Sequence, residues 1–394
     1  MEKTDAVVVG CGLSGAVTAR HLAEKLNLRV LILERRDHIG GNMYDYVDAN
    51  GILVHKYGPH TFHTSKKPLL DFMKRYARWQ DYELTCGAIL DGKYTPTPFN
   101  FQTIDDFFER EQAAAMKAAV RKAYPGMETV PVLELLEHTD DRIRQYAEFL
   151  FEKDYRPYTA KQWGIPPEEI DPAVLKRVPV RLSYDIGYFD DPYQVMPETS
   201  YTDFFSNILD HPNIRVRLRQ NAENCLSLDE TRKILIFGGK SFQGICIYTG
   251  AIDELFGCRY GRLPYRSLRF EWKHENRKSF QQAPVVAYPQ KEDYTRITEY
   301  TKLPMQDVGE LTCYAVEYPL PYEKEKTAEP YYPVLTEKSI SLHQKYRREA
   351  SRYPNLYLCG RLADFRYYNM DQALEKALAL CKHLDDRYVP EKNR

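Results

Sequence analysis

Ala6-Val-Val-Val-Gly10-Cys-Gly-Leu-Ser-Gly15 reads as a short apolar strand and a glycine-rich turn that leads into a helix. The helical pattern continues over residues 16–26, and residues 29–33 form a second apolar strand that ends at Glu34. Glycines at this spacing allow a tight turn and let backbone N–H groups approach a pyrophosphate at the helix N-terminus. Glu34 stands where an acid would bond the ribose hydroxyls. The stretch therefore predicts a dinucleotide-binding β-α-β unit.

The sequence that follows favours FAD over NAD as the dinucleotide. Glu34-Arg-Arg-Asp-His-Ile-Gly-Gly-Asn42 has an acid followed by a Gly-Gly pair, the form of the second signature in large FAD proteins. Ile245-Cys-Ile-Tyr-Thr-Gly250 and Leu358-Cys-Gly360 resemble later strands that return to the same cofactor. Each of these glycines alone could mark an ordinary turn, but their ordered combination indicates FAD.

Composition and charge exclude several classes of protein. The chain has 394 residues, and its 55 Lys and Arg nearly balance its 56 Asp and Glu. A broad nucleic-acid-binding surface is therefore not expected. No apolar run approaches the roughly 20 residues of a membrane span. No signal-peptide pattern precedes the first strand, so we expect a cytoplasmic protein.

Cysteine and histidine spacing predicts no disulfide framework and no metal site. The eight cysteines form no CxxC pair, and the ten histidines show no HExxH spacing. We expect reduced, mostly buried thiols. The 31 tyrosines are the unusual feature of the composition. Tyrosine combines a flat apolar face with a hydroxyl, which suits contacts to a sugar, a base or a phosphate.

The middle of the chain contains two helical patterns. One helix is predicted over residues 103–124, with Thr103 as its N-cap and Pro125-Gly126 as its end. A second is predicted over residues 140–153, where apolar side chains recur at helical spacing. Residues 155–171 are interrupted by glycine and proline and are predicted to be a loop.

The last third of the chain favours strands before it returns to a strand-turn-helix pattern. An antiparallel sheet is predicted from residues 267–272, 284–288, 294–300 and 311–318. Residues 355–359 then form a strand, and residues 370–387 a helix. Because strand-helix patterns occur at both ends, one nucleotide-binding domain assembled from separate segments is expected.

These patterns predict a mixed α/β fold with three domains. The first is a discontinuous Rossmann-like FAD-binding domain formed by residues 1–67, 195–258 and 345–394. The second is an inserted helical domain with a substrate lid, residues 100–170. The third is an antiparallel sheet domain formed by residues 68–99, 171–194 and 259–344.

Several longer stretches resemble the motifs of one enzyme family and occur in the same order along the chain. They are His55-Lys-Tyr-Gly-Pro-His60-Thr-Phe-His-Thr64, Tyr158-Thr-Ala-Lys-Gln-Trp-Gly164, Lys176-Arg177-Val-Pro-Val-Arg181, Leu263-Pro-Tyr-Arg-Ser-Leu-Arg-Phe270, Tyr294-Thr-Arg296-Ile, Pro330-Tyr-Tyr-Pro333, Gly360-Arg-Leu362 and Arg366-Tyr-Tyr-Asn-Met370. Together they span nearly the whole chain. By these motifs the chain resembles the bacterial UDP-galactopyranose mutases.

The resemblance implies roles for individual residues. For FAD it implies Gly10, Gly12, Ser14, Gly15, Glu34, Arg35, Gly41, Asn42, His60, Gly250, Gly360, Arg361 and Met370. For the substrate it implies Tyr158, Thr159, Trp163, Tyr188, Tyr331, Tyr332, Tyr367 and Asn369. The catalytic residues implied are Arg177 and Arg296, which would flank the diphosphate, and His60, which would lie near the flavin ring.

The resemblance also implies a reaction. The family contracts the sugar ring of UDP-galactopyranose to UDP-galactofuranose without net redox change, through an adduct between flavin N5 and the sugar. FAD is active when reduced by NAD(P)H or dithionite. The substrate would be a UDP-sugar, and a homodimer would be consistent with the family, although the sequence offers no interface signature.

Two departures from the family pattern leave the identity of the sugar open. The family usually has Asp where this chain has Asn369, and Tyr94-Thr-Pro-Thr-Pro-Phe-Asn100 lacks the common asparagine-led form. A related nucleotide hexose is therefore an alternative substrate. An FAD-dependent oxidoreductase of the amine-oxidase or desaturase kind, and an inactive nucleotide-sugar binder, are the alternative functions.

Overall fold

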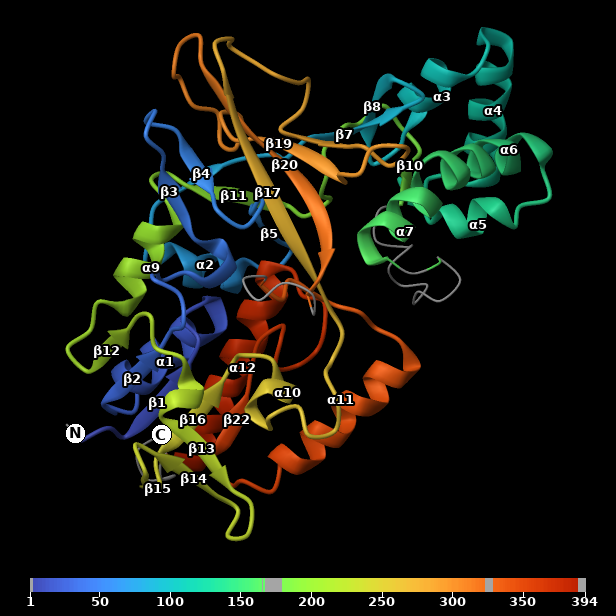
Figure 1. Cartoon of the computed structure of the whole chain (residues 1–394). Helices are drawn as coiled ribbons and strands as arrows, with labels where there is room; N and C mark the ends of the chain where they lie inside the picture. Colours follow the sequence, from blue (N-terminus) through green and yellow to red (C-terminus); the bar gives the residue numbers. More distant parts are fainter. Residues whose placement is uncertain (1–2, 165, 167–178, 323–328, 389–394) are drawn as a thin grey trace.

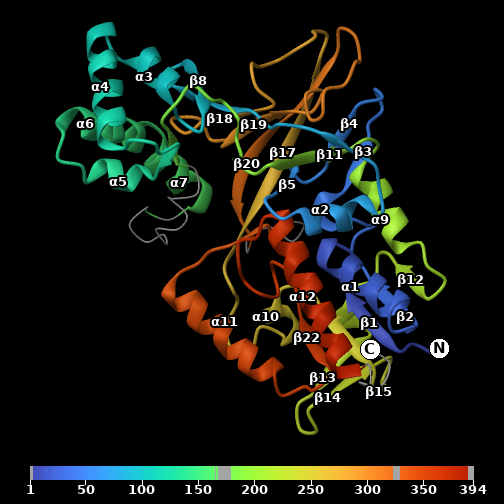
Figure 2. The same cartoon turned by 180° about the vertical axis from the view of Figure 1, so that it is seen from behind.

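A computed structural model describes residues 3–164, 166, 179–322 and 329–388. Figure 1 shows a parallel sheet near the two termini, a larger sheet above it, and a group of helices, α3 to α7, to one side of the larger sheet. Figure 2 gives the same arrangement from behind, with the long strands β17 and β20 running between these regions. The fold is mixed α/β, as predicted.

The parallel sheet has five strands in the order β12-β2-β1-β16-β22. Their bounds are β1 Ala6–Val9, β2 Val30–Leu33, β12 Ile214–Arg217, β16 Ile245–Tyr248 and β22 Leu356–Leu358. Strands far apart in the sequence pair directly, since Ala6 lies opposite both Val30 and Ile245. This arrangement assembles a Rossmann-like sheet from separate segments.

Side chains alternate between the two faces of this sheet because successive residues of a strand point in opposite directions. Val8 belongs to a core shared with helices α1 Leu13–Glu24, α9 Tyr201–Leu209 and α12 Met370–Tyr388. Val7 belongs to a second core on the other face. That core is completed by α10 Ile252–Leu255, α11 Glu337–Ala350, and a small sheet of β13 Leu226–Asp229, β14 Ile234–Phe237 and β15 Lys240–Phe242.

The larger sheet has seven strands in the order β21-β17-β20-β19-β18-β7-β8. Their bounds are β7 Cys86–Leu90, β8 Lys93–Thr97, β17 Tyr265–Glu275, β18 Val285–Ala287, β19 Arg296–Glu299, β20 Thr312–Pro321 and β21 Tyr332–Pro333. The four strands predicted in this region pair antiparallel, as expected. β7 joins β18 in parallel, a pairing that the sequence did not predict.

Smaller elements connect the two sheets. They are α2 Lys67–Lys74, the hairpin of β3 Asp45–Val47 and β4 Leu53–His55, the sheet of β5 Phe62–Thr64, β11 Tyr193–Pro197 and β6 Trp79–Asp81, the pair of β9 Thr129–Val130 and β10 Val180–Arg181, and the short 3₁₀ turns Gly41–Met43 and Ala222–Asn224.

The predicted helix over residues 103–124 is two helices, α3 Phe101–Phe107 and α4 Arg110–Ala123. The prediction of Thr103 as N-cap was wrong. Asn100 is the N-cap, and the Thr103 side chain bonds back to it in a capping box. The chain is extended at Phe108, which lets that ring pack against Phe149.

The predicted loop over residues 155–171 was wrong for its first half. Helix α6 Asp141–Leu150 continues through a π-helical turn, η2 Phe151–Tyr155, into α7 Arg156–Trp163. The proline of α7 lacks the backbone N–H that would bond back into this continuous helix, and it lies just after the π-helical turn, where the regular ladder of hydrogen bonds is already interrupted. Gly164, at φ 64°, ends the helix. Together with α3, α4 and α5 Val132–Leu136, these helices surround a third core.

Two sequence-based expectations concern groups spread over the whole fold. All eight cysteines are free, and six of them are buried, as expected. Among the described residues, no helix combines the length and the apolar character needed to cross a bilayer.

Candidate active site

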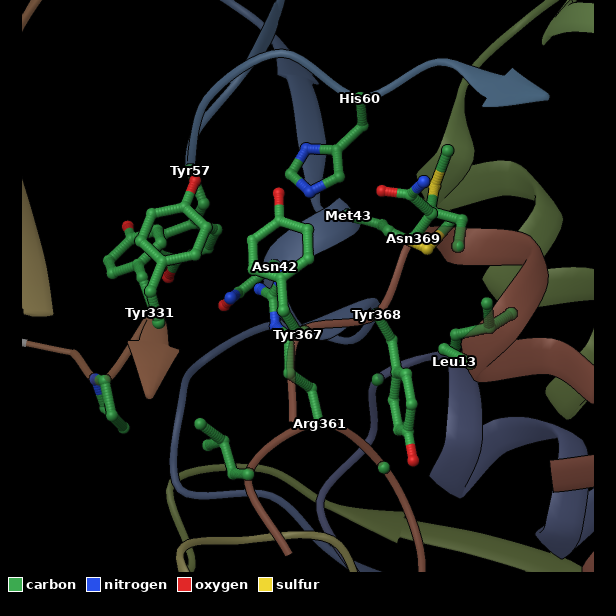
Figure 3. A pocket seen from close by; sticks show the side chains of 18 of the residues that line it. Leu13, Asn42, Met43, Tyr57, His60, Tyr331, Arg361, Tyr367, Tyr368 and Asn369 are labelled. Atoms are coloured by element: carbon green, nitrogen blue, oxygen red, sulfur yellow. The ribbon is translucent and has the colours of Figure 1, made fainter. Parts of the chain in front are cut away.

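A cavity of about 530 Å³ lies where the parallel sheet, the seven-stranded sheet and the α7 region meet. Its wall is formed by the glycine turn after β1, the loop that carries Tyr57 and His60, and residues of α7, β18, β19 and β21. The segment before α12 closes it. Figure 3 shows His60 projecting into the cavity, with Tyr57 and Tyr331 on one side and Asn369 on the other.

The glycine turn forms a cradle that larger residues would fill. A Cβ at Gly10 would lie 2.2 Å from Thr249 Oγ1, and Gly10 has a φ of 95° that side chains rarely allow. A Cβ at Gly15 would lie 2.0 Å from the Gly10 carbonyl oxygen. The turn therefore brings bare backbone to the N-terminus of α1, as a pyrophosphate site requires.

Glu34 ends β2 at the same edge of the sheet and is buried. Its Oε2 accepts the Cys11 backbone N–H at 2.8 Å, and its Oε1 accepts the Arg36 N–H at 2.9 Å. These two bonds fix the carboxylate beside the glycine turn. The arrangement matches the place of the ribose-binding acid in dinucleotide folds.

Two arginines follow Glu34 and bind an acid from a distant segment. Arg35 and Arg36 both form ion pairs with Glu329, which directly precedes the Pro330-Tyr331-Tyr332 stretch. The Arg36 guanidinium also lies over the Tyr57 ring, 4.3 Å from its centroid, and donates to Asn42 at 2.8 Å. Arg36 lies within the Glu34–Asn42 signature but was not predicted as a site residue.

His60 is held in a neutral state with a defined tautomer. Its Nδ1 lies 2.8 Å from the Gly58 carbonyl oxygen, which can only accept, so Nδ1 carries the proton. Burial lowers the pKa of His60 to about 4, and the cations Arg361 and Arg296 act in the same direction. Nε2 is therefore a hydrogen-bond acceptor near neutral pH.

Arg296 is oriented by a buried carboxylate on the neighbouring strand. Its Nε donates to Glu317 Oε2 at 2.7 Å, and Thr298 donates to the other oxygen at 2.9 Å. The Glu317 side chain is fully buried. Burial alone would lower the pKa of Arg296, but Glu317 raises it well above its ordinary value. The guanidinium stays charged at the cavity wall.

Aromatic rings and an arginine form a layered group next to Arg296. The rings of Tyr332 and Tyr367 stack with centroids 5.7 Å apart and planes 13° apart. The Arg361 guanidinium lies 5.4 Å from the Tyr332 ring centroid and 5.9 Å from that of Tyr367. This group places two phenols and two cations on one side of the cavity, a suitable environment for an anion.

Nearly all of the predicted site residues line this one cavity, with roles that remain predictions. Those for the cofactor are Gly10, Gly12, Ser14, Gly15, Glu34, Arg35, Gly41, Asn42, His60, Gly250, Gly360, Arg361 and Met370. Those for the substrate and catalysis are Tyr158, Thr159, Tyr188, Arg296, Tyr331, Tyr332, Tyr367 and Asn369. Arg177 and most of the predicted lid lie outside the described residues, as does the side chain of Trp163.

Other lining residues were not predicted. Met43, Tyr57, His63, Thr97, Phe99 and Asp154 belong to this set. Tyr57 and His63 lie within a quoted motif, so the signal was present. Thr95, which belongs to the Tyr94–Asn100 stretch that departs from the family pattern, is fully buried and donates to Thr103 at 2.9 Å. Its neighbours Thr97 and Phe99 face the cavity instead.

One group of potential metal ligands among the described residues lies away from this cavity. The ligand atoms of Asp48, His274 and Cys313 all lie within 4.8 Å of one another. Asp48 Oδ2 and His274 Nε2 are 2.7 Å apart, which is a hydrogen-bond distance. The pair is therefore explained without a metal.

The chain is similar in sequence to two family profiles and to mutases that act on nucleotide sugars. A family profile described as UDP-galactopyranose mutase matches residues 153–367, and one described as an NAD(P)-binding Rossmann-like domain matches residues 8–76. The UDP-galactopyranose mutase of Mycoplasma pneumoniae is 35% identical over 97% of this chain and 96% of its own length. The dTDP-fucopyranose mutase of Escherichia coli is 34% identical over 94% of this chain and 96% of its own length.

Solved structures support the same fold. A crystal structure of reduced UDP-galactopyranose mutase superposes with a TM-score of 0.75, covering 99% of this chain and 96% of that one at 17% identity. A putative protoporphyrinogen oxidase from an Exiguobacterium species superposes with a TM-score of 0.64 at 13% identity. At these identities both likenesses concern the fold alone.

Proposed function

Since this chain belongs to the UDP-galactopyranose mutase family, it is an isomerase that interconverts pyranose and furanose forms of a nucleotide sugar, and we propose that it acts on a UDP-sugar with FAD as cofactor. The observation that carries the proposal is that the glycine cradle and Arg296 open into one cavity. A dinucleotide and an anionic substrate can therefore lie side by side. UDP-galactopyranose and UDP-galactofuranose are the first pair to test.

The described residues fit FAD. The Gly10–Gly15 turn leaves room at the N-terminus of α1, and Glu34 lies beside it. Gly360 and Arg361 bring a second glycine-led turn to the same cavity. In the proposal these residues hold the dinucleotide, and His60 and Met370 lie near the flavin ring. When bound and reduced, the flavin would supply the nucleophile for the anomeric carbon of the sugar.

Arg296 would hold the diphosphate throughout the reaction. Its Nε is used by Glu317, and no described residue accepts a hydrogen bond from its Nη atoms. A planar guanidinium fixed in this way suits two phosphate oxygens, and each charge-assisted bond contributes about 1.5–3 kcal/mol. If the diphosphate stays bound after it leaves the sugar, its return becomes effectively intramolecular. Tyr332 and Tyr367 would add neutral donors.

His60 would act as an acceptor and not as an acid. Its proton is on Nδ1, and its pKa is lowered to about 4 by burial, so Nε2 presents a lone pair. It would orient a hydroxyl or an N–H group near the flavin ring and would not donate a proton to the substrate. This role explains how a histidine can lie close to two arginines.

Asn369 is the residue we propose to influence the choice of sugar. It lies directly before α12 and lines the cavity, and its amide offers both a donor and an acceptor. An aspartate there could only accept. Replacement by aspartate is expected to change the ratio of kcat/KM values between nucleotide hexoses, with little effect on FAD content.

The proposal is tested by conversion of UDP-galactofuranose to UDP-galactopyranose, followed by chromatography. FAD-loaded protein reduced with dithionite should convert it, and the oxidised protein should not. Reaction of another nucleotide furanose but not of UDP-galactofuranose would move the proposal to that sugar. If the reduced, FAD-loaded protein turned over none of them, the proposed substrate and the proposed role of FAD in the reaction would be wrong.

A further inference from the structure

Asp154 is an acid in the cavity wall whose carboxyl group has no partner among the residues that the structure describes. It lies in the π-helical turn η2 and forms no hydrogen bond or ion pair with any residue that the structure describes. Other acids of the wall are bound: Glu34 accepts two backbone N–H groups, and Glu254 accepts the Tyr322 hydroxyl at 2.6 Å. An unpartnered acid facing a cavity is available to a ligand.

The nearest cation does not neutralise this acid by direct contact. Lys161 lies on α7, but its Nζ donates to the carbonyl oxygens of Tyr288 at 2.6 Å and Tyr294 at 3.1 Å. These two bonds tie α7 to the ends of β18 and β19. Because the lysine is held in this way, Asp154 keeps its hydrogen-bonding capacity for the cavity.

Among the described residues, Lys161 is the one cation that acts on the Asp154 carboxyl group. Tyr155 and Tyr158 are the titratable groups that face it from η2 and α7 besides Lys161. Strand β18 contributes only Val285 and Ala287 to the wall. Arg296 of β19 is paired with Glu317, as described above. The carboxyl group therefore lies among side chains that suit a flat base more than a phosphate.

We propose that Asp154 recognises the base of the nucleotide sugar, as a neutral carboxylic acid paired with the imide edge of uracil or thymine. The proposal rests on the function proposed above, and it takes Tyr158 and Thr159, two of the expected substrate residues in the cavity wall, as neighbours of the base. The acid O–H would donate to a ring carbonyl, and the acid C=O would accept the ring N3–H. Donor and acceptor stand side by side on both partners, so two hydrogen bonds form at once.

The charge state of Asp154 decides which base fits. A carboxylate offers only acceptors, which would face the carbonyl oxygens of an imide but would match the adjacent N1–H and N2–H donors of guanine. Burial raises the pKa of Asp154 to about 7, and Lys161 opposes this effect. The protonated form is therefore accessible near neutral pH, and it is the form that can pair with the imide edge of uracil or thymine.

Nucleotide binding to the oxidised, FAD-loaded protein tests this inference. UDP, dTDP, CDP and GDP are titrated at pH values on both sides of about 7. The wild-type affinity for UDP and dTDP should fall about tenfold for each pH unit above the pKa of Asp154. Asp154→Asn should bind UDP as well as the wild type does at low pH and should keep that affinity at high pH. Its carboxamide donates and accepts in the same arrangement at every pH.

Two further variants complete the comparison. Asp154→Ala should bind UDP about tenfold to a hundredfold more weakly at low pH, because both hydrogen bonds are lost. Glu152→Gln alters an exposed acid on the same turn, which pairs with Arg156, and should keep the wild-type affinity and pH profile. At each pH, the UDP affinity of the wild type is divided by that of Asp154→Asn. The diphosphate titrates equally in both measurements, so its contribution cancels in this ratio.

Several results would overturn the inference. Asp154→Asn with the wild-type pH profile would show that another group titrates. If the wild type bound GDP more tightly than UDP, and Asp154→Asn bound UDP more tightly than GDP, the acid would be ionised and would pair with guanine. Normal UDP binding by Asp154→Ala would remove Asp154 from the base site while leaving the proposed mutase function intact. Absence of UDP binding and of turnover in the wild type would instead contradict the proposed function.

Discussion

Arg296 donates its Nε–H to the carboxylate of Glu317 over 2.7 Å, and the Glu317 side chain is fully buried. The two residues face each other on paired strands, β19 and β20. A buried acid that serves one arginine fixes both the charge and the direction of the guanidinium. The pair therefore prepares a cationic site before any anion enters the cavity.

Removing the acid should reduce catalysis without removing the cofactor. Glu317→Gln keeps the shape of the side chain but loses its charge, so Arg296 is held less firmly. We expect kcat/KM to fall about tenfold, the loss of one charge-assisted contact. FAD content, measured by absorbance, should stay normal. An unchanged kcat/KM would show that Glu317 does not position Arg296.

Removing the arginine should affect both stability and activity, and the two effects can be separated. Arg296→Met leaves Glu317 buried and unpaired, which costs about 3–5 kcal/mol of unfolding free energy. The double variant R296M/E317Q removes both charges and should recover much of that stability in denaturant unfolding. If its activity recovered as well, Arg296 would have no role in the reaction.

The glycine turn offers a matched pair of substitutions. A Cβ at Gly15 would lie 2.0 Å from the Gly10 carbonyl oxygen, so Gly15→Ala must displace backbone and should lower both the Tm and the FAD content. A Cβ at Gly12 meets only the Gly41 Cα at 3.6 Å, an ordinary contact. Gly12→Ala should therefore leave the Tm of the FAD-free protein near the wild-type value. Equal Tm losses in both variants would contradict this account of the cradle.

His55 should make the fold sensitive to acid. It is fully buried, accepts the His60 backbone N–H at 3.1 Å through Nδ1, and burial lowers its pKa from 6.5 to about 3. Between these two pH values, His55 binds a proton in the unfolded chain but not in the native state. The free energy of unfolding therefore decreases as pH falls from about 6.5 toward about 3.

His55→Asn keeps an acceptor for the His60 N–H and removes the titration. The slope of unfolding free energy against pH should therefore become shallower by about 1.4 kcal/mol per pH unit in this window. Denaturant unfolding at several pH values measures the slope. Identical slopes in the two proteins would mean that His55 does not carry the acid sensitivity.

The hydroxyls of the stacked tyrosines should matter for substrate binding. Tyr332→Phe and Tyr367→Phe keep the rings that stack at 5.7 Å but remove a donor from the cavity. We expect UDP to bind about fivefold to tenfold more weakly in each. Tyr318→Phe is the control, because the Tyr318 hydroxyl bonds Glu271 at 3.1 Å outside the cavity. A loss of affinity in the control would point to a general effect of these substitutions.

Local patterns in the sequence were sufficient for much of the fold. The Gly10–Gly15 turn between two apolar runs is a short-range feature, and so are the strands later found as β17, β19 and β20. The errors also have local causes. The chain interrupts the helix at Phe108 so that this ring can reach Phe149, and it continues helically through Pro157 because the π-helical turn before it already interrupts the regular hydrogen-bond ladder. Neither choice is visible without the packing partner.

The sequence by itself determined the dinucleotide turn, the alternation of strands and helices, and the resemblance to one enzyme family. Only the tertiary structure decided how side chains are paired and charged. Glu317 was not recognised as the partner of Arg296, because 21 residues separate them and strand pairing alone brings them together. Asp154 looks like any polar helix residue until its turn is placed in the cavity wall. Burial and the absence of a partner are properties of three-dimensional packing, and these two properties set the pKa and the hydrogen-bonding role of such an acid.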